Sequence, residues 1–348
     1  MDHRRKDQQS MKLDVLYQFN EKYAPYAGAS ITSLFENNRH ADRIRVFILG
    51  ENLSPESEAK LRSLAAGYHR CLCFIDTKEL VFRMKQMNMP KYRGSYAANM
   101  RLFLSWLLND DVERLLYLDA DTIVNGPLDE LNSLDMEGHP LAMSLDSLVR
   151  LHKRRLGFSK DDYYYNSGVI LFDMKKWRSD RCSERIANHV KNVRAWYPSP
   201  DQDLLNVVLK GEIMRLPAEY NIEPAYLAFS LRDYFRTFGS RGFYSLDELH
   251  DALRKPVIFH FFRFVGEFPW HKDNVHPDNA LFDKYIALSP WRGYRKQPAD
   301  TGIVLKFEKV LYRKIPRSVF IRLFRLAYEW FIRKANQDSL KCKTNRTM

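Results

Sequence analysis

Two aspartates that follow a short apolar run are the residues of this chain best suited to chemistry. Residues Leu115–Leu118 have strong strand preference, and Asp119 and Asp121 come next, separated by a single residue. Side chains two positions apart in an extended chain point the same way, so both carboxylates should converge beyond the end of the strand. Open α/β sheets place their ligands at that edge. Converging carboxylates suit a hard divalent cation that keeps positions free for phosphate oxygens. The pair therefore predicts a metal–phosphate site, and the alternative is a strand that ends in a solvated acidic turn.

The segments on either side of this pair alternate between strand and helix patterns. We expect strands over 13–19, 44–49, 71–75, 115–118, 141–145, 168–172 and 257–262. Helices are expected over 28–38, 55–66, 97–108, 182–193, 202–209 and 282–288, the second of them capped by Ser54. This alternation predicts an α/β fold with a mixed, mainly parallel sheet flanked by helices. Residues 229–248 are aromatic and irregular, and they predict a loop or a lid.

The composition is that of a globular protein. The chain has 348 residues, of which 45% are hydrophobic and 14% aromatic, so a disordered chain is excluded. No run approaches the roughly 18 apolar residues of a membrane-spanning helix. Residues 1–12 are polar and charged, which predicts a flexible N-terminus without the apolar core of a signal peptide. The four cysteines lack zinc-ligand spacing, and Cys71 and Cys73 are expected to be buried thiols of a reducing cytosol.

The positive charge of the chain is concentrated at its C-terminal end. Residues 301–348 hold twelve Lys and Arg but three Asp and Glu, which accounts for +9 of the net charge of +12. Because the rest of the chain is close to neutral, no nucleic-acid partner is expected. Within 315–334, Arg side chains form one polar stripe and Phe, Leu and Trp cover the remainder. This pattern predicts contact with an anionic membrane surface, and the alternative is a helix packed on the domain with its charges solvated.

These features divide the chain into three parts. They are the N-terminus over 1–12, a catalytic domain over 13–300 and a basic amphipathic tail over 301–348. Truncation after Asp300 is expected to preserve the activity of the domain on soluble substrates and to reduce membrane binding.

The motif Asp-x-Asp-Thr after an apolar strand occurs in two very different classes of enzyme. In phosphatases of the haloacid-dehalogenase type, Asp119 would be a nucleophile and Asp121 a general acid. That motif lies on the first strand of its fold, whereas three strand–helix units precede it here. The acidic pair Asp161-Asp162, which a phosphatase would also need, follows a polar segment. The order of elements therefore favours the second class, transferases in which the motif binds a metal ion that holds a nucleotide diphosphate.

Four ordered blocks resemble glycosyltransferase family 8, whose single domain has the GT-A nucleotide-diphospho-sugar fold. The blocks are Leu118–Val124, Tyr164–Phe172, Asp201–Asn206, and His260 with Gly266–Trp270. The resemblance covers about 13–291 and is strongest to the bacterial branch that builds surface polysaccharide or lipopolysaccharide. Any one block is a weak signal, but four in this order are specific.

The resemblance implies a metal site and a set of donor contacts. Asp119, Asp121 and His260 would ligate Mn²⁺, and Mg²⁺ suits an imidazole with two carboxylates less well. Taken alone, His260 near a strand end and Arg101 on a helix could be a structural histidine and an exposed charge. The implied contacts to the donor come from Asn20, Tyr23, Arg101, Asp119, Ala120, Asp121, Asp146, Asn166, Gly266 and Lys272.

The implied reaction centre is Gln202 with Asp201, since enzymes of this family retain the anomeric configuration. An amide is a poor nucleophile, so we expect the carbonyl of Gln202 to stabilise an oxocarbenium-like centre. Asp201 would orient the sugar hydroxyls, and it also fits the N-cap of the following helix. Asn166 would contact the sugar, with Gly168 allowing close approach, or it lies in a turn before a strand.

Two stretches depart from the family pattern. Asn20 stands where the family often has an acidic residue that reads uracil, and its amide oxygen can still accept from N3–H. The family's phosphate-binding loop usually reads Gly…Lys-Pro-Trp after the histidine. Here Gly266–Trp270 is part of a loop that is longer by two residues and lacks that lysine, so Lys272 or Arg263 would supply the charge.

The sequence thus predicts a retaining, metal-dependent hexosyltransferase. It would move glucose or galactose from a UDP-sugar to a glycan or lipid-linked glycan acceptor of cell-surface polysaccharide or lipopolysaccharide. We expect it in the cytoplasm, on the inner face of the cytoplasmic membrane. The alternatives are the phosphatase with Asp119 as nucleophile and a non-enzymatic binder of membranes or acidic polymers that acts through the tail.

Overall fold

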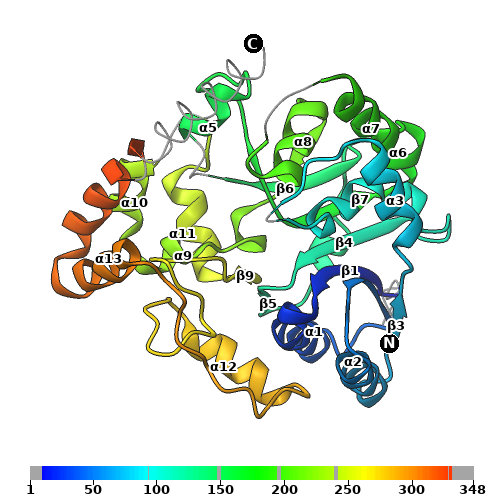
Figure 1. Cartoon of the computed structure of the whole chain (residues 1–348), viewed down its shortest axis with the longest axis horizontal. Coiled ribbons are helices and arrows are strands. Elements are labelled where there is room, and N and C mark those ends of the chain that lie inside the picture. The colour runs from blue at the N-terminus through cyan, green and yellow to red at the C-terminus, as the bar shows by residue number, and fades with distance from the viewer. Residues whose placement is uncertain are drawn as a thin grey trace, which may run out of the picture.

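The computed structural model describes residues 10–92, 94–146, 150–193, 197–238, 242–327 and 329–330. Most of the N-terminus expected to be flexible, Cys342 and the end of the tail lie outside these residues, as does part of the segment expected to be a loop or a lid. Within them the chain folds around a seven-stranded sheet with the strand order β3-β2-β1-β4-β7-β6-β8 (Figure 1). The strands are β1 (Lys12–Asn20), β2 (Arg43–Glu51), β3 (Cys71–Phe74), β4 (Arg114–Asp119), β6 (Leu141–Leu145), β7 (Tyr165–Asp173) and β8 (Ile213–Arg215).

The sheet is mixed and mainly parallel, as the sequence predicts. Among these strands only β7 runs against its neighbours: it pairs antiparallel with both β4 and β6, whereas the other pairs are parallel. The start of β7 therefore lies at the same edge of the sheet as the ends of β4 and β6. Strand β7 begins at Tyr165, three residues before the expected start, so Asn166 lies in the strand and not in a turn before it.

Helices cover both faces of the sheet. Along β1, Val15 and Tyr17 join the core under α1 (Ala24–Asn37) and α2 (Pro55–Gly67), while Leu16 joins the core on the other face. That second core is built with α3 (Lys78–Gln86), α6 (Met174–Ser179) and α7 (Cys182–Asn192) (Figure 1). The expected cap of α2 is confirmed, because the Ser54 side chain accepts a hydrogen bond from the N–H of Ser57.

The remaining helices are of two kinds, 3-10 helices and α-helices. The 3-10 helices are η1 (Glu21–Tyr23), η2 (Ala97–Trp106) and η3 (Ala218–Tyr220). The α-helices are α4 (Asp129–Asn132), α5 (Arg150–Arg155), α8 (Pro200–Val208), α9 (Pro224–Ala228), α10 (Leu231–Phe238), α11 (Leu246–Arg254), α12 (Asn279–Leu288) and α13 (Ile303–Lys314).

Two sequence-based expectations about local structure are wrong, and a third, the helix over 97–108, is confirmed as a helix but of the 3-10 type. The segment expected to be a loop or lid forms α10 and the start of α11, because Leu231, Tyr234 and Phe238 recur at helical spacing and are buried. The helix expected over 97–108 is the 3-10 helix η2, in which the N–H of Arg101 donates to the side chain of Gln18 (3.1 Å). The thiol-bearing residue Cys71 is exposed, because β3 is an edge strand of the sheet, and Cys73 of the same strand is only partly buried.

A second, two-stranded sheet was not expected as such. Strand β5 (Thr122–Val124) leaves the turn after β4 and pairs antiparallel with β9 (Ile258–His260), so that Thr122 lies opposite His260. This pairing joins the Asp-x-Asp turn to a segment far away in the sequence.

The tail packs on the domain over part of its length. Beyond α13, a helix over 317–327 buries Phe320 and Ile321, and the Phe320 ring stacks on Phe229 at 6.2 Å between centroids. Other apolar residues of the same segment, such as Leu323 and Leu326, stay exposed. In the described part of the chain, no helix combines the length and the apolar character needed to cross a membrane.

Candidate active site

A cavity of about 540 Å³ opens where the ends of β1, β4 and β6 meet the start of β7. This volume is within the usual range of pockets for small molecules. The reversed direction of β7 explains why its first residues line the cavity beside the ends of parallel strands. The lining includes Gln18, Asn20, Tyr23, Arg101, Asp119, Ala120, Asp121, Asp146, Asn166, Ser167, Asp201, Gln202, His260, Phe262, Arg263 and Phe268.

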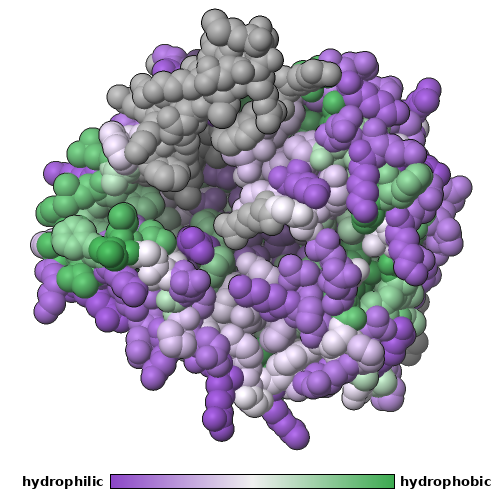
Figure 2. Space-filling model, viewed as in Figure 1, coloured by the Kyte–Doolittle hydropathy of each residue, from purple (hydrophilic) through white to green (hydrophobic). Residues whose placement is uncertain are grey.

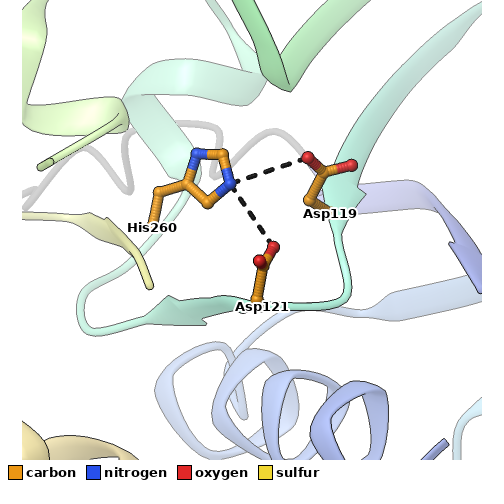
Figure 3. Close-up of side chains that lie close together, drawn as sticks. All are labelled: Asp119, Asp121 and His260. Carbon is orange, nitrogen blue, oxygen red and sulfur yellow. Dashed lines mark ion pairs between the residues drawn. The ribbon is translucent and has the colours of Figure 1, made fainter. Parts of the chain in front are cut away.

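Three side chains at the wall of this cavity form a candidate metal site. The N–H of Phe261 donates to the carbonyl of Asp121 (2.7 Å), which extends the β5–β9 ladder and sets His260 beside the carboxylates. The Nε2 atom of His260 lies 3.4 Å from Asp121 Oδ1 and 3.6 Å from Asp119 Oδ2 (Figure 3). One ligand atom from each residue lies within 4.8 Å of the others.

The surroundings of His260 leave Nε2 directed at the two carboxylates. Its Nδ1–H donates to Asn221 Oδ1 (3.0 Å), and such a second partner fixes the orientation of a metal-binding imidazole. Burial lowers the pKa of His260, but the hydrogen bond to Asp121 and the charges of Asp121 and Asp119 raise it more, so the net shift is upward. A divalent cation at this place would be attracted by the charges of Asp119 and Asp121 and would bind Nε2 of His260. Two carboxylates and an imidazole fit such an ion.

Gly168 makes the room that the imidazole needs. A Cβ atom on Gly168 would lie 2.0 Å from Cε1 and 2.5 Å from Nδ1 of His260. From the sequence, we expect this glycine to allow close approach by the sugar. The structure shows a different neighbour, the ring of His260.

Arg101 connects the candidate metal ligands to the candidate reaction centre. Its side chain is 6% exposed, and Nη2 lies 3.1 Å from Asp119 Oδ1 and 3.5 Å from Asp201 Oδ2. Its Nη1 donates to the carbonyl of Ser167 (2.7 Å), and the guanidinium lies over the ring of Tyr117 (3.9 Å). Burial alone would lower the pKa of Arg101, but Tyr117, Asp119 and Asp201 together raise it. Arg101 is therefore a buried cation between two carboxylates and not an exposed helix charge.

Asp201 faces the cavity instead of capping its helix. The N-cap position of α8 is Ser199, and the Ser199 N–H donates to Asp203 Oδ2 (3.0 Å), so the expectation of Asp201 as N-cap is wrong. Asp201 Oδ2 instead accepts from the hydroxyl of Ser167 (3.1 Å). Burial raises the pKa of Asp201, as does the charge of Asp119, and Arg101 opposes both.

Gln202 is held by hydrogen bonds at both ends of its amide. Its Oε1 accepts from the N–H of Ser167 (3.0 Å), and its Nε2 donates to Asp146 Oδ2 (3.2 Å). Asn166 Nδ2 donates to the same oxygen of Asp146 (3.5 Å). A carbonyl oxygen accepts two hydrogen bonds, so Oε1 of Gln202 keeps acceptor capacity toward the cavity.

Asn221 was not predicted from the sequence, and it links Asn166 of β7 to His260 of the candidate metal site. Its Nδ2 donates to Asn166 Oδ1 (3.0 Å), while its own Oδ1 accepts from His260. In the sequence the available signal was one polar residue between Tyr220 and Ile222, and the structure shows that all three are buried.

Not every expected donor residue lines the cavity. Among the described lining residues, Phe262, Arg263 and Phe268 come from the loop after β9, and Gly266 and Lys272 do not appear. Gly266 packs instead against Leu305 of α13, and the N–H of Lys272 donates to the carbonyl of Gln297 (2.8 Å).

The chain is similar to the members of one known protein family. Residues 14–274 match the model of glycosyl transferase family 8. The chain is 27% identical over 312 residues to a lipopolysaccharide 1,2-glucosyltransferase of Escherichia coli K12, covering 85% of this chain and 83% of the relative. It is 25% identical over 293 residues to a lipopolysaccharide 1,3-galactosyltransferase of Salmonella typhimurium LT2, covering 80% and 79%.

A solved structure supports the fold. The galactosyltransferase LgtC, in complex with donor and acceptor sugar analogues, aligns with a TM-score of 0.63 at 24% identity. The alignment covers 81% of this chain and all of that one. The expected GT-A fold is thereby confirmed.

Gly168→Ala is expected to weaken Mn²⁺ binding, because the new methyl group and the buried His260 ring cannot occupy the same space. A displaced ligand of this kind typically costs about 10- to 100-fold in metal affinity. Isothermal titration with Mn²⁺ measures the change. Gly67→Ala is the matched control, because a Cβ atom there meets nothing within 4 Å. Unchanged Mn²⁺ affinity in a folded Gly168→Ala protein would contradict the metal assignment.

Proposed function

The chain belongs to glycosyl transferase family 8, and on that basis we propose that it transfers a hexose from a UDP-sugar to a glycan acceptor. The transfer retains the anomeric configuration and uses a divalent cation, with Mn²⁺ preferred over Mg²⁺. The observation that carries this proposal is the convergence of Asp119, Asp121 and His260 on one wall of the cavity. The names of the glucosyl- and galactosyltransferase relatives support glucose or galactose as the sugar and lipopolysaccharide or another surface polysaccharide as the product.

Asn20 supports a uracil nucleotide. Asn20 lines the cavity, and its Oδ1 is buried without a hydrogen-bond partner in the described part of the chain. A buried acceptor without a partner is costly, and the N3–H of uracil would satisfy it. Tyr23 lies in the same wall and offers an aromatic ring beside the base.

The candidate metal residues and the loop after β9 would hold the diphosphate. A cation bound by Asp119, Asp121 and His260 would neutralise negative charge on the departing UDP. Arg263 is the cation of the loop that lines the cavity, so we assign to it the role that the family's lysine usually fills.

The sugar would lie over α8. Asp146 and Asn166 present an oxygen and an amide to its hydroxyls. Gln202 is oriented by Ser167 and Asp146, so its carbonyl is available to stabilise positive charge at the anomeric carbon. Asp201, fixed by Arg101 and Ser167, would position a hydroxyl of the sugar.

The phosphatase alternative is not favoured. Its second acidic pair would have to reach the nucleophile, yet Asp161 and Asp162 are absent from the described residues that line the cavity. Asp162 instead forms an ion pair with Lys210 (2.6 Å). A binder without activity has no use for the buried network around Arg101, so that alternative is not favoured either.

A thermal-shift experiment with UDP tests the assignment. UDP with Mn²⁺ should stabilise the wild-type protein, by about 2.7 kcal/mol at a ligand concentration of 100 times Kd. Asp121→Asn should abolish the shift, because it removes one charged ligand with little change in shape. Asp110→Asn is the control, since that side chain is 97% exposed. Stabilisation of Asp121→Asn equal to that of the wild type would remove the metal–diphosphate assignment.

We also propose that the tail contacts an anionic membrane on the cytoplasmic side, where a lipid-linked acceptor would be found. Helix α13 exposes Ile303 (86%), Val304 (79%) and Phe307 (62%), and Leu326 of the next helix is 63% exposed. Figure 2 shows apolar side chains gathered over the part of the surface where α13 lies in Figure 1. An exposed apolar face beside Lys and Arg suits the interface of an anionic bilayer.

The double substitution Phe307→Ser with Leu326→Ser should reduce binding to phosphatidylglycerol vesicles by roughly tenfold or more, because two apolar side chains no longer enter the interface. Vesicle co-sedimentation measures the effect. The control is Phe82→Ser on α3, which removes a similarly exposed aromatic residue (54%) from another helix. Equal binding by the double variant and the wild type would exclude this face as the membrane contact.

A further inference from the structure

The loop after β9 contains a tight hairpin over 263–268 that forms part of the cavity wall. The N–H of Phe264 donates to the carbonyl of Glu267 (2.8 Å), and the N–H of Glu267 donates back to Phe264 (3.0 Å). Between them, Val265 and Gly266 both have positive φ (47° and 74°), as a two-residue hairpin turn of type I′ requires. Arg263 and Phe268, which flank this turn, line the cavity.

The opposite side of the hairpin rests on α13. Glu267 Oε1 forms an ion pair with Lys309 Nζ at 2.8 Å, and the two side chains are 6% and 17% exposed. The ring of Phe264 lies 5.4 Å from that of Tyr312, edge to face. A Cβ atom on Gly266 would lie 2.9 Å from Cβ of Leu305, so the turn is in direct contact with the helix.

We propose that Lys309 is a positioning residue for the donor site, acting through Glu267 on the hairpin that carries Arg263 and Phe268. The proposal rests on the proposed function, because it assigns the hairpin to the donor. A charge as enclosed as that of Glu267 is expensive without a partner, and its Oε2 already lacks a hydrogen bond within the described chain. Loss of Lys309 therefore favours any arrangement that moves Glu267 toward water.

The turn itself has little preference for its observed shape. Valine is branched at Cβ and rarely adopts positive φ, so Val265 keeps its conformation because the surroundings hold it. The contacts of Phe264, Gly266 and Glu267 with α13 supply that support. When Glu267 moves, Arg263 and Phe268 move with it, because they flank the same four-residue turn.

The proposed role of Lys309 gives the tail a part in supporting the cavity, in addition to the expected membrane contact. Helix α13 lies beyond residues 14–274, which match the family model, yet it supports a wall of the cavity. Truncation after Asp300 would remove Lys309, Leu305 and Tyr312 together. The expectation that such a truncation preserves activity on soluble acceptors therefore conflicts with the packing of the hairpin.

Lys309→Met in the full-length chain tests the proposal. In the presence of Mn²⁺, its Kd for UDP and its KM for the donor should rise roughly tenfold, because a wall of the site is displaced. Amide hydrogen exchange at Phe264 and Glu267 should become faster. Lys306→Met is the matched control, since it removes the same charge from an exposed position of the same helix. Lys309→Arg, which keeps the charge, should restore both properties.

A double variant separates positioning from general destabilisation. In Glu267→Gln with Lys309→Met no buried charge is left alone, so its loss of UDP affinity should be smaller than that of Lys309→Met alone. Unchanged UDP affinity and exchange in Lys309→Met would overturn the role of Lys309, as would an equal loss in Lys306→Met or no rescue by Lys309→Arg. Failure of the wild type to bind UDP with Mn²⁺ would overturn the proposed function and this inference with it.

Discussion

The site depends on keeping three carboxylates close together in a partly buried place. Asp119, Asp121 and Asp201 all line one cavity, and their mutual repulsion has to be offset by neighbouring side chains of the fold. Arg101 does this as a cation between Asp119 and Asp201, and the imidazole of His260 lies beside both Asp119 and Asp121. Asp119 is shared by both, so the proposed metal ligands and the proposed reaction centre are electrostatically coupled. A divalent cation at His260 would therefore also influence the balance between Arg101 and Asp201.

The chain brings these groups together by topology and not by proximity in sequence. The reversed strand β7 delivers Asn166 and Ser167 to the edge where β4 ends, and the pairing of β5 with β9 delivers His260. Gly168 then permits the ring of His260 to lie against β7. Asn221 links these two segments, because it forms hydrogen bonds with both Asn166 and His260. Each of these contacts is a requirement on backbone geometry, so the site is built by the sheet more than by its loops.

The sequence predicts those parts of the site that a local pattern determines. Asp119 and Asp121 could be predicted because strand preference and a period of two are local properties. His260 and Gln202 needed the family resemblance, since nothing near either residue specifies its distant partners. Asn221 and the pair of Glu267 with Lys309 escaped both routes, because they depend on packing between segments that no local pattern connects. The fold shows the same division: the sheet was predicted, while the exposure of Cys71 follows from the place of β3 at an edge of the sheet. The helix α10 is a different case, because its helical spacing is present in the sequence and the expectation of a loop overlooked it.

The tail shows why a count of charged residues in the sequence overstates the basic surface that the tail could offer to a membrane. Lys309 is one of the twelve basic residues of 301–348, yet it is enclosed with Glu267. Arg313 donates to the carbonyl of Asp273 (2.7 Å), and Arg325 forms an ion pair with Glu329 (3.0 Å). These side chains make contacts within the protein, so they contribute less to a basic surface for a membrane. Exposed apolar residues of α13 such as Phe307 are therefore a better guide to the contact surface than the net charge is. Because α13 carries these residues on one side and supports the 263–268 hairpin on the other, a single helix lies between the proposed membrane contact and the proposed donor site.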